Sequence, residues 1–398
     1  MTNLSHLMSL PSLLGRWRGS PRRRGHEQHL AAHDPSVGVE RRHLPRRLGR
    51  GIASMLLLAA FGATDRAQAQ TITLVNQGGA PGEAQKVAIF EPFTKETGIQ
   101  IKVDTYNQEL AKIRAQIETK NAIWDVVSLN PLNERAGCEE GLLEKIDWKS
   151  LIDPRQFEAI GGFGECGAPY LVSPGAMVYD GAKFSEDKVP KSWMDFWDVK
   201  KFPGKRGMVF QPDQTLEPAL MADGVAPADV IKVLTGPGGV DRAFRKLAEI
   251  KPYVKWWKAG DESMQLILTG EVDMVYAWQG RVNIANRSNK RDLRIVWPAG
   301  YVNALIYLGI MKGSPRKAEA IKLIQYQLAA QPQARFAELM GYPPANSAAY
   351  SMLSAEKRAS LPEKYAAQGM MQGGSQYLNF WLDNGDSIRQ RFATFTAQ

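Results

Sequence analysis

The chain has 398 residues, a formal net charge of +9, five histidines and two cysteines. Its first 70 residues hold eleven arginines, four carboxylates and all five histidines, so this segment carries +7 and the remaining 328 residues only about +2. Charge therefore gives no support to nucleic-acid binding, and Ser-His-Asp catalysis, Cys-His catalysis and histidine-based metal sites are excluded after residue 70.

The N-terminal segment ends with the features of a secretory signal peptide. A basic stretch leads into the apolar run "IASMLLLAAFGA" (52–63) and the small-residue site "AQAQ" (67–70), and this order is typical of a signal peptide. The run is too short to span a membrane as a helix. We expect cleavage near Ala69 and a periplasmic mature protein. The long stretch before residue 46 indicates either a start codon assigned too far upstream or a twin-arginine signal at "ERRHLPRR".

The first half of the mature chain alternates between strands and helices. The predicted elements are a strand at 71–75, a helix at about 82–97 kinked at Pro92, a strand at 99–104, a helix at 108–120 and a strand at 124–129. The first helix is expected to place Val87, Phe90 and Phe93 on its inner face. This β-α-β-α-β order predicts a largely parallel sheet flanked by helices.

A second set of alternating elements follows. The predicted elements are a strand at 207–212, a helix at 240–250, a strand at 253–257, a helix at 263–270, a strand at 271–277 and helices at 314–329 and 331–341. The helix at 314–329 is expected to bury Ala318, Ile321 and Ile324. Two such α/β units predict the fold class α/β, with facing strand ends that form a cleft able to close around a solute.

Two further local features have a structural interpretation. Cys138 and Cys166 are an even pair in an exported chain, which predicts a disulfide. The segment "GFGECG" (162–167) formally matches GxGxxG, but Pro169 follows where a helix should begin, so we expect a loop rather than a phosphate cradle.

Several motifs resemble one family in this order along the chain. They are "FEPFTKETGIQIKV" (90–103), "CEEGLLEKIDW" (138–148), "SWMDFWDVKKFPGKRG" (192–207), "GEVDMVYAWQGRVNIANR" (270–287) and "AIKLIQYQLAAQPQARFAELMGYPPANSAA" (320–349). The chain from residue 71 resembles the periplasmic solute-binding proteins of ABC importers, in the polyamine (spermidine/putrescine)-binding branch and its γ-aminobutyrate-like relatives. The resemblance implies a two-lobed periplasmic binding protein (Venus-flytrap) fold. One lobe is expected from 71–172 plus 305–345, and the other from 173–304 plus 346–398.

The resemblance also assigns ligand-binding roles. Trp278 falls on the family's stacking tryptophan and Tyr342 on its cleft tyrosine. Where the polyamine branch has a carboxylate that grips an ammonium, this chain has Ile306, with Ala304 in place of an aromatic residue. Arg281 instead suits a carboxylate, which arginine can bind through two hydrogen bonds. The alternative is that Arg281 points out of the cleft or pairs with a protein acid such as Asp273.

Weaker candidates lie in the first loop, at the end of the third strand, at the first crossing between the lobes, and in or after the segment "WWKAGDE" (256–262). They are Gln77, Gly78, Ser128, Asn130, Ser173, Ser263 and Trp257 of the Trp256–Trp257 pair. Asp261 and Glu262 are alternative partners for an ammonium. The pairs Asp261–Glu262 and Glu139–Glu140 leave open an exported hydrolase or lyase, and a ferric-ion binder lacks its usual tyrosine pair. The leading interpretation is a monomeric binding protein with no catalytic residues, metal or cofactor, whose partners are a small solute and a membrane permease.

Overall fold

The computed structural model describes residues 70–398. The predicted signal peptide and its cleavage site at Ala69 lie outside these residues. Within them, no helix is long and apolar enough to cross a bilayer.

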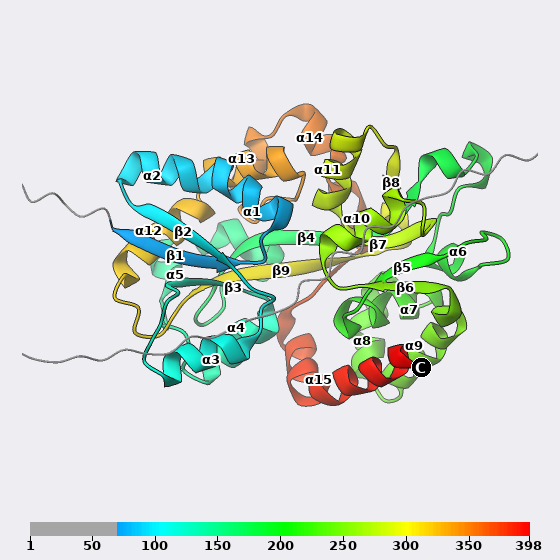
Figure 1. Cartoon of the computed structure of the whole chain (residues 1–398), viewed down its shortest axis with the longest axis horizontal. Coiled ribbons are helices and arrows are strands. Elements are labelled where there is room, and N and C mark those ends of the chain that lie inside the picture. The colour runs from blue at the N-terminus through cyan, green and yellow to red at the C-terminus, as the bar shows by residue number, and fades with distance from the viewer. Residues whose placement is uncertain (1–69) are drawn as a thin grey trace, which may run out of the picture. The chain divides into compact units, whose positions relative to one another are not determined.

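The strands of the described chain form one ten-stranded mixed sheet (Figure 1). They are β1 (Thr71–Asn76), β2 (Gln100–Thr105), β3 (Val126–Leu129), β4 (Ala168–Asp180), β5 (Arg206–Val209), β6 (Val254–Trp257), β7 (Met274–Trp278), β8 (Leu293–Ile295), β9 (Tyr301–Ile310) and β10 (Gly369–Met371). The order is β2-β1-β3-β9-β4-β7-β5-β6, with β10 on β9 and β8 on β4. As predicted, β1 pairs in parallel with β2 and β3, and β5 pairs in parallel with β6 and β7.

Two long antiparallel strands join the parallel groups. β4 and β9 pair from Ala168 opposite Leu308 to Gly175 opposite Val302, and β4 continues along β7. Neither strand was among the predicted elements. In β4, Pro169 and Pro174 argue against a central strand. The sheet accommodates Pro169 through a register shift before Leu171.

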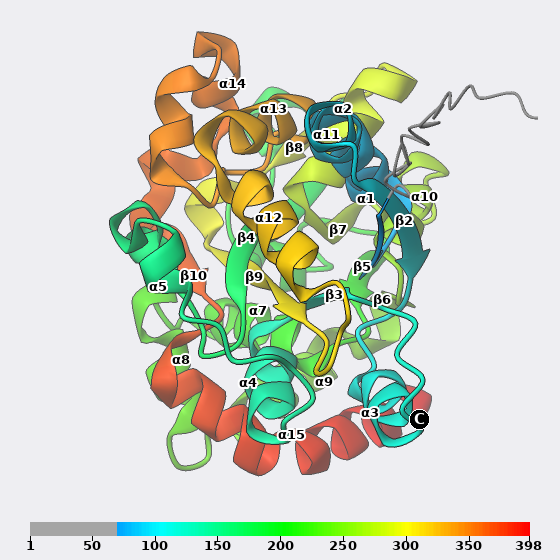
Figure 2. The same cartoon turned by 90° about the vertical axis from the view of Figure 1, so that its left-hand side faces the viewer.

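The helices cover both faces of the sheet (Figures 1 and 2). They are α1 (Gly79–Gln85), α2 (Glu91–Thr97), α3 (Leu110–Glu118), α4 (Pro131–Glu139), α5 (Trp148–Leu151), α6 (Trp193–Trp197), α7 (Leu216–Ala222), α8 (Val230–Thr235), α9 (Gly239–Ile250), α10 (Gly260–Leu268), α11 (Gln279–Asn289), α12 (Lys317–Leu328), α13 (Ala330–Met340), α14 (Ala355–Ser360) and α15 (Gly374–Ala397). The C-terminal helix α15, absent from the sequence prediction, packs against α4, where Arg135 donates a 2.7 Å hydrogen bond to Asn379.

Two predicted helix faces were wrong in part. A π-helical segment at Lys86–Phe90 joins α1 to α2 and ends just before Pro92, whose missing N–H and ring disrupt the regular α-helical bonding. The wider π turn rotates the helix, so Val87 is 55% exposed while Phe93 is buried. In α12 the buried face is shifted: Ala318 is exposed and Ile321 is only half-buried, whereas Ile324 is buried.

Hydrophobic side chains gather in two main cores. The first core lies among β1, β3, β9 and the helices α2, α12 and α13, and includes Leu74 and Leu308. The second core lies among β4–β7 and the helices α6–α10 and α15, and includes Leu247 and Trp381. The segment 347–361 packs on α13 of the first core through Leu353. The residue boundaries given above for the two lobes stay a prediction.

The disulfide predicted from the cysteine pair is present. Cys138, in α4, is bonded to Cys166, with a Cα–Cα distance of 5.6 Å. Residues 162–167 form a loop, as predicted. The Glu134 carboxylate holds this loop by accepting hydrogen bonds from the backbone N–H groups of Cys166 (3.0 Å) and Gly167 (2.7 Å). The glycine-rich segment is therefore a structural loop fixed by a disulfide and a buried carboxylate.

Candidate functional site

The start of α1, after β1, meets the starts of α10 and α11, after β6 and β7, in the structure. Gly79, the first residue of α1, faces Asp261 of α10 and Arg281 of α11. A Cβ atom on Gly79 would lie 3.2 Å from Asp261 Oδ2 and 3.5 Å from Arg281 Nη2. The tertiary structure thus brings the predicted Gln77–Gly78 loop to the Trp278–Arg281 segment, about 200 residues away in sequence.

Trp278 ends β7 at the centre of an aromatic group. Its Nε1 donates a 2.9 Å hydrogen bond to Gln214 Oε1, which also accepts from the Tyr276 hydroxyl at 3.0 Å. Trp257 packs edge-on against Trp278, with ring centroids 5.0 Å apart. Within residues 70–398 the buried Nε1 of Trp257 has no hydrogen-bond partner, whereas Trp256 packs against Phe392. Of the tryptophan pair, Trp257 is the residue beside the candidate site.

The Arg281 guanidinium lies over the Trp278 ring, 5.3 Å from its centroid. Its Nε donates to Asp261 Oδ1 at 3.0 Å, and the side chain is 12% exposed against 68% for Asp261. Asp273, the acid named as the alternative partner, pairs instead with Lys183 at 2.7 Å. Asp261 is therefore already neutralised by an arginine and is not a free partner for an ammonium.

The first core contributes hydroxyl and amide groups. Ser128 Oγ lies 3.2 Å from Gln77 Nε2 and 3.1 Å from the Tyr170 hydroxyl, and burial raises the pKa of Tyr170 to about 12. Tyr342 is buried, and its ring lies so close to α11 that a Cβ on Gly280 would be 2.6 Å from the ring. Tyr342 therefore packs beside the turn that carries Arg281.

Several predicted candidates already use their polar atoms within the protein. Asn130 caps α4 by accepting from the backbone N–H of Asn133 at 2.8 Å. The buried Ser263 hydroxyl donates to the Gly260 carbonyl at 2.5 Å, and Glu262 accepts from the backbone N–H of Lys258 at 2.7 Å. These contacts give local structural roles to Asn130, Ser263 and Glu262.

Two other candidates lie in the central strands. Ser173 is buried in β4 opposite Ala304 of β9. Ile306, at the position of the polyamine-gripping carboxylate, pairs with Leu171 in the same ladder. The central strands thus supply a hydroxyl at Ser173 and an apolar side chain at Ile306.

Two acids on the segment that carries Gln214 were missed from the sequence. Asp213 lies in the turn after β5 that also carries Gln214, and Glu217 lies one helical turn on, in α7. Glu217 is fully buried. Its Oε1 accepts from the Tyr377 hydroxyl at 3.3 Å, whereas Oε2 has no partner in the described part of the chain. The available signal was "QPDQTLEP", which places two acids directly after a predicted strand.

The surroundings of both acids disfavour their ionised forms. Burial, and then the charge of Asp213, raise the pKa of Glu217 well above its usual range. Burial also raises the pKa of Asp213. A cation next to these carboxylates would stabilise their ionised forms, because an opposite charge offsets the cost of desolvation.

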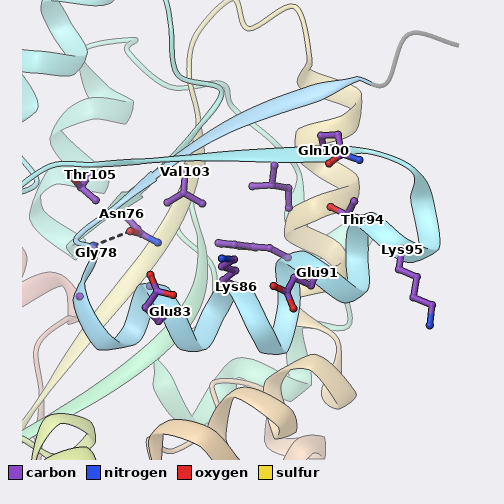
Figure 3. Close-up of a pocket in the computed structure, with 14 residues that line it drawn as sticks. Asn76, Gly78, Glu83, Lys86, Glu91, Thr94, Lys95, Gln100, Val103 and Thr105 are labelled. Carbon is purple, nitrogen blue, oxygen red and sulfur yellow. Dashed lines mark hydrogen bonds between the residues drawn. The ribbon is translucent and has the colours of Figure 1, made fainter.

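A groove of about 670 Å³ lies beside the loop after β1, between the edge strand β2 and the helix running from α1 to α2 (Figure 3). Asn76 Oδ1 accepts there from the Gly78 backbone N–H at 2.8 Å. The side chains that line the groove include acidic and basic ones, and Figure 3 shows Glu83, Lys86 and Glu91 along the helix. The groove shares Gly78 and Gly79 with the candidate site but contains none of the aromatic group around Trp278.

Aromatic and charged side chains lie at strand ends of a sheet that runs through two cores. This arrangement is typical of a protein that binds a small solute. Residues 88–367 match the family of bacterial extracellular solute-binding proteins, and the chain belongs to this family. The family binds solutes without transforming them, in agreement with the prediction that the chain is not an enzyme.

Individual relatives cover most of the chain. It is 38% identical, over 85% of its length and 94% of the relative, to a gamma-aminobutyric acid-binding protein of Pseudomonas aeruginosa. It is 27% identical, over 67% of its length and 76% of the relative, to a spermidine/putrescine-binding periplasmic protein of Escherichia coli. The crystal structure of an ABC transporter substrate-binding protein from Bradyrhizobium japonicum superposes with a TM-score of 0.72 at 35% identity, covering 82% of this chain and 99% of that chain. The two-lobed periplasmic binding protein fold predicted from the sequence is confirmed.

Proposed function

We propose that this protein captures a small zwitterion in the periplasm and delivers it to the membrane permease of an ABC importer. Arg281 holds the anionic end of the solute, and Glu217 with Asp213 holds the ammonium end. γ-Aminobutyrate is the leading candidate. One observation carries the proposal: Trp278 contacts the Arg281 guanidinium through its ring and reaches, through Gln214, the turn that leads to Glu217, whose buried Oε2 has no partner within residues 70–398.

Trp278 connects the two charged groups. The guanidinium covers its ring, while its Nε1 reaches Gln214 in the turn that carries Asp213. A solute that lies along the free surface of the indole places one end near each charge. A buried arginine favours a carboxylate, and a buried glutamate favours an ammonium, because leaving either charge unpaired in a closed cleft is costly.

A polyamine is the second candidate. The spermidine/putrescine-binding relative and the acids at 213 and 217 favour it. Arg281 and the apolar Ile306 oppose it, since a polyamine has no anionic group for arginine. The relative that carries the name gamma-aminobutyric acid-binding protein has the higher identity, and this favours the zwitterion.

The remaining features complete the proposal. The chain is exported with a signal peptide cleaved near Ala69 and acts as a monomer with no nucleic-acid partner. Its lobes comprise 71–172 plus 305–345 and 173–304 plus 346–398, with the solute between them. Further lining residues are Gln77, Gly78, Ser128, Trp257 and Tyr342, while Asn130, Ser173 and Ser263 support the walls behind them.

Identification of the native solute tests the proposal directly. Purified protein is denatured, and the released small molecules are identified by mass spectrometry. Titration calorimetry then compares γ-aminobutyrate with putrescine on the unaltered protein, on Arg281→Ala and on the exposed-arginine control Arg245→Ala.

The expected pattern depends on the charge of each ligand. Truncating one partner of a desolvated charge pair costs about 2–5 kcal/mol, so Arg281→Ala should weaken γ-aminobutyrate binding roughly 30-fold or more. Arg245→Ala should bind like the unaltered protein. Tight putrescine binding that is unchanged or improved in Arg281→Ala, without γ-aminobutyrate binding, would establish the polyamine function instead. Recovery of a chemically altered solute over repeated cycles would favour the hydrolase or lyase.

A further inference from the structure

The Arg281 guanidinium is enclosed on several sides. Asp261 accepts from its Nε at 3.0 Å, and the Trp278 ring lies against its face. The backbone of Gly260 passes directly beside it, because a Cβ there would lie 2.2 Å from Nε. From the other core, Gly79 approaches Nη2 and Asp261 Oδ2. The position and direction of the guanidinium are therefore fixed before any solute binds.

These contacts leave one edge of the guanidinium free. Within residues 70–398, its hydrogen bonds to the protein involve Nε alone. The two Nη atoms form a fork that matches the two oxygens of a carboxylate. Asp261 thus occupies Nε of the guanidinium. The two Nη atoms stay available to a solute beside the start of α1.

The Asp261 carboxylate also changes the charge presented to a solute. Arg281 alone would offer a full positive charge, whereas the Arg281–Asp261 pair is neutral overall. A second negative charge on a bound head group would lie close to the Asp261 carboxylate, and like charges at short range repel. Because Asp261 is 68% exposed, solvent screens this repulsion without removing it.

From this arrangement we infer that Asp261 is a specificity-determining residue: it selects solutes with a singly charged carboxylate over analogues with a doubly charged phosphonate. The inference rests on the proposed function, in which Arg281 receives the anionic end. Asp261 acts through Arg281 and through its own charge, and it needs no direct hydrogen bond to the solute.

The test uses two ligands that differ only in the charged head group. γ-Aminobutyrate and 3-aminopropylphosphonate are titrated calorimetrically into the unaltered protein, Asp261→Asn and Glu262→Gln, above the second ionisation of the phosphonate. Asp261→Asn keeps an oxygen for Arg281 Nε but removes the charge. Glu262→Gln removes a charge from the same helical turn, and this side chain contacts the backbone at Lys258 rather than Arg281.

We expect Asp261→Asn to shift the affinity ratio toward the phosphonate by about tenfold, which corresponds to about 1.4 kcal/mol, and the shift to shrink at high salt. Glu262→Gln should leave the ratio unchanged. Equal weakening of both ligands by Asp261→Asn would mean that Asp261 only positions Arg281, and would overturn the inference, as would an equal shift in Glu262→Gln. If the unaltered protein binds neither ligand, the proposed solute class and this inference fail together.

Discussion

Replacement of Glu217 by glutamine is the most direct test of the ammonium end of the site. The change keeps the size of the side chain and an oxygen for Tyr377, and it removes the buried negative charge. Loss of one partner from a desolvated charge pair costs about 2–5 kcal/mol. Part of this interaction energy is spent on ionising Glu217 when the solute binds. Removing the proton costs about 1.4 kcal/mol for each unit by which the pKa of Glu217 exceeds the working pH. We therefore expect about 2 kcal/mol, or roughly 30-fold weaker γ-aminobutyrate binding.

The pH dependence gives this prediction a second readout. Burial raises the pKa of Glu217 in the free protein. The carboxyl group therefore keeps its proton at pH values above the usual pKa of glutamate. A bound ammonium lowers that pKa again, so binding releases protons, and affinity increases as pH rises toward the pKa of the free protein. Stability of the solute-free protein has the opposite trend: the raised pKa favours the folded state at low pH, and this contribution is lost as pH rises from the usual glutamate range through the raised pKa.

Titration calorimetry in two buffers with different ionisation enthalpies measures both quantities. The unaltered protein should release up to one proton per solute, and Glu217→Gln should release fewer and bind more weakly. Glu249→Gln is the control, since Glu249 is an exposed acid paired with Lys246. Unchanged affinity and proton release in Glu217→Gln would show that the ammonium binds elsewhere.

Three further predictions concern the solute site and the stability of the fold. Trp278→Ala should weaken γ-aminobutyrate and putrescine to a similar extent in calorimetry, because stacking depends little on ligand charge; a loss confined to one ligand would contradict a stacking role. Replacing both Cys138 and Cys166 by serine should lower the free energy of unfolding by about 3–4 kcal/mol in the loop-entropy model, measured by urea denaturation, and an unchanged midpoint would contradict this. The Lys317 ammonium, with a backbone N–H group, lowers the pKa of Glu144 to about 2, so Glu144→Gln should cost about 1 kcal/mol at neutral pH. This difference should fade as pH falls from the usual glutamate pKa toward about 2, and a constant difference would refute the assignment.

Most of the parallel strands could be predicted from the sequence because their signals are local. Alternating apolar residues and turn-forming loops marked β1, β2 and β3, and the same reasoning found β6 and β7 in the second half. The pairing of Cys138 with Cys166 followed from the number of cysteines and the predicted export. Trp278 and Arg281 were proposed as site residues because they directly follow a predicted strand, where ligands of α/β proteins commonly bind, and their role in binding stays a prediction.

Long-range packing decided the rest. β4 and β9 form a continuous ladder although Pro169 and Pro174 disfavour a strand. The ladder depends on hydrogen bonds to partner strands that are distant in sequence, and the local sequence carries no signal for them. The partner of Arg281 could not be chosen from the sequence, since Asp261 and Asp273 are both near in the chain. In the sequence, Glu217 is indistinguishable from any acid that follows a strand. Its burial beside Tyr377 of α15 raises the pKa of its carboxyl group and leaves one carboxylate oxygen without a partner within residues 70–398. Sequence thus determined the elements and the residue types at their ends, whereas the charge state and partners of each side chain depend on distance and burial, which exist only once the chain has folded.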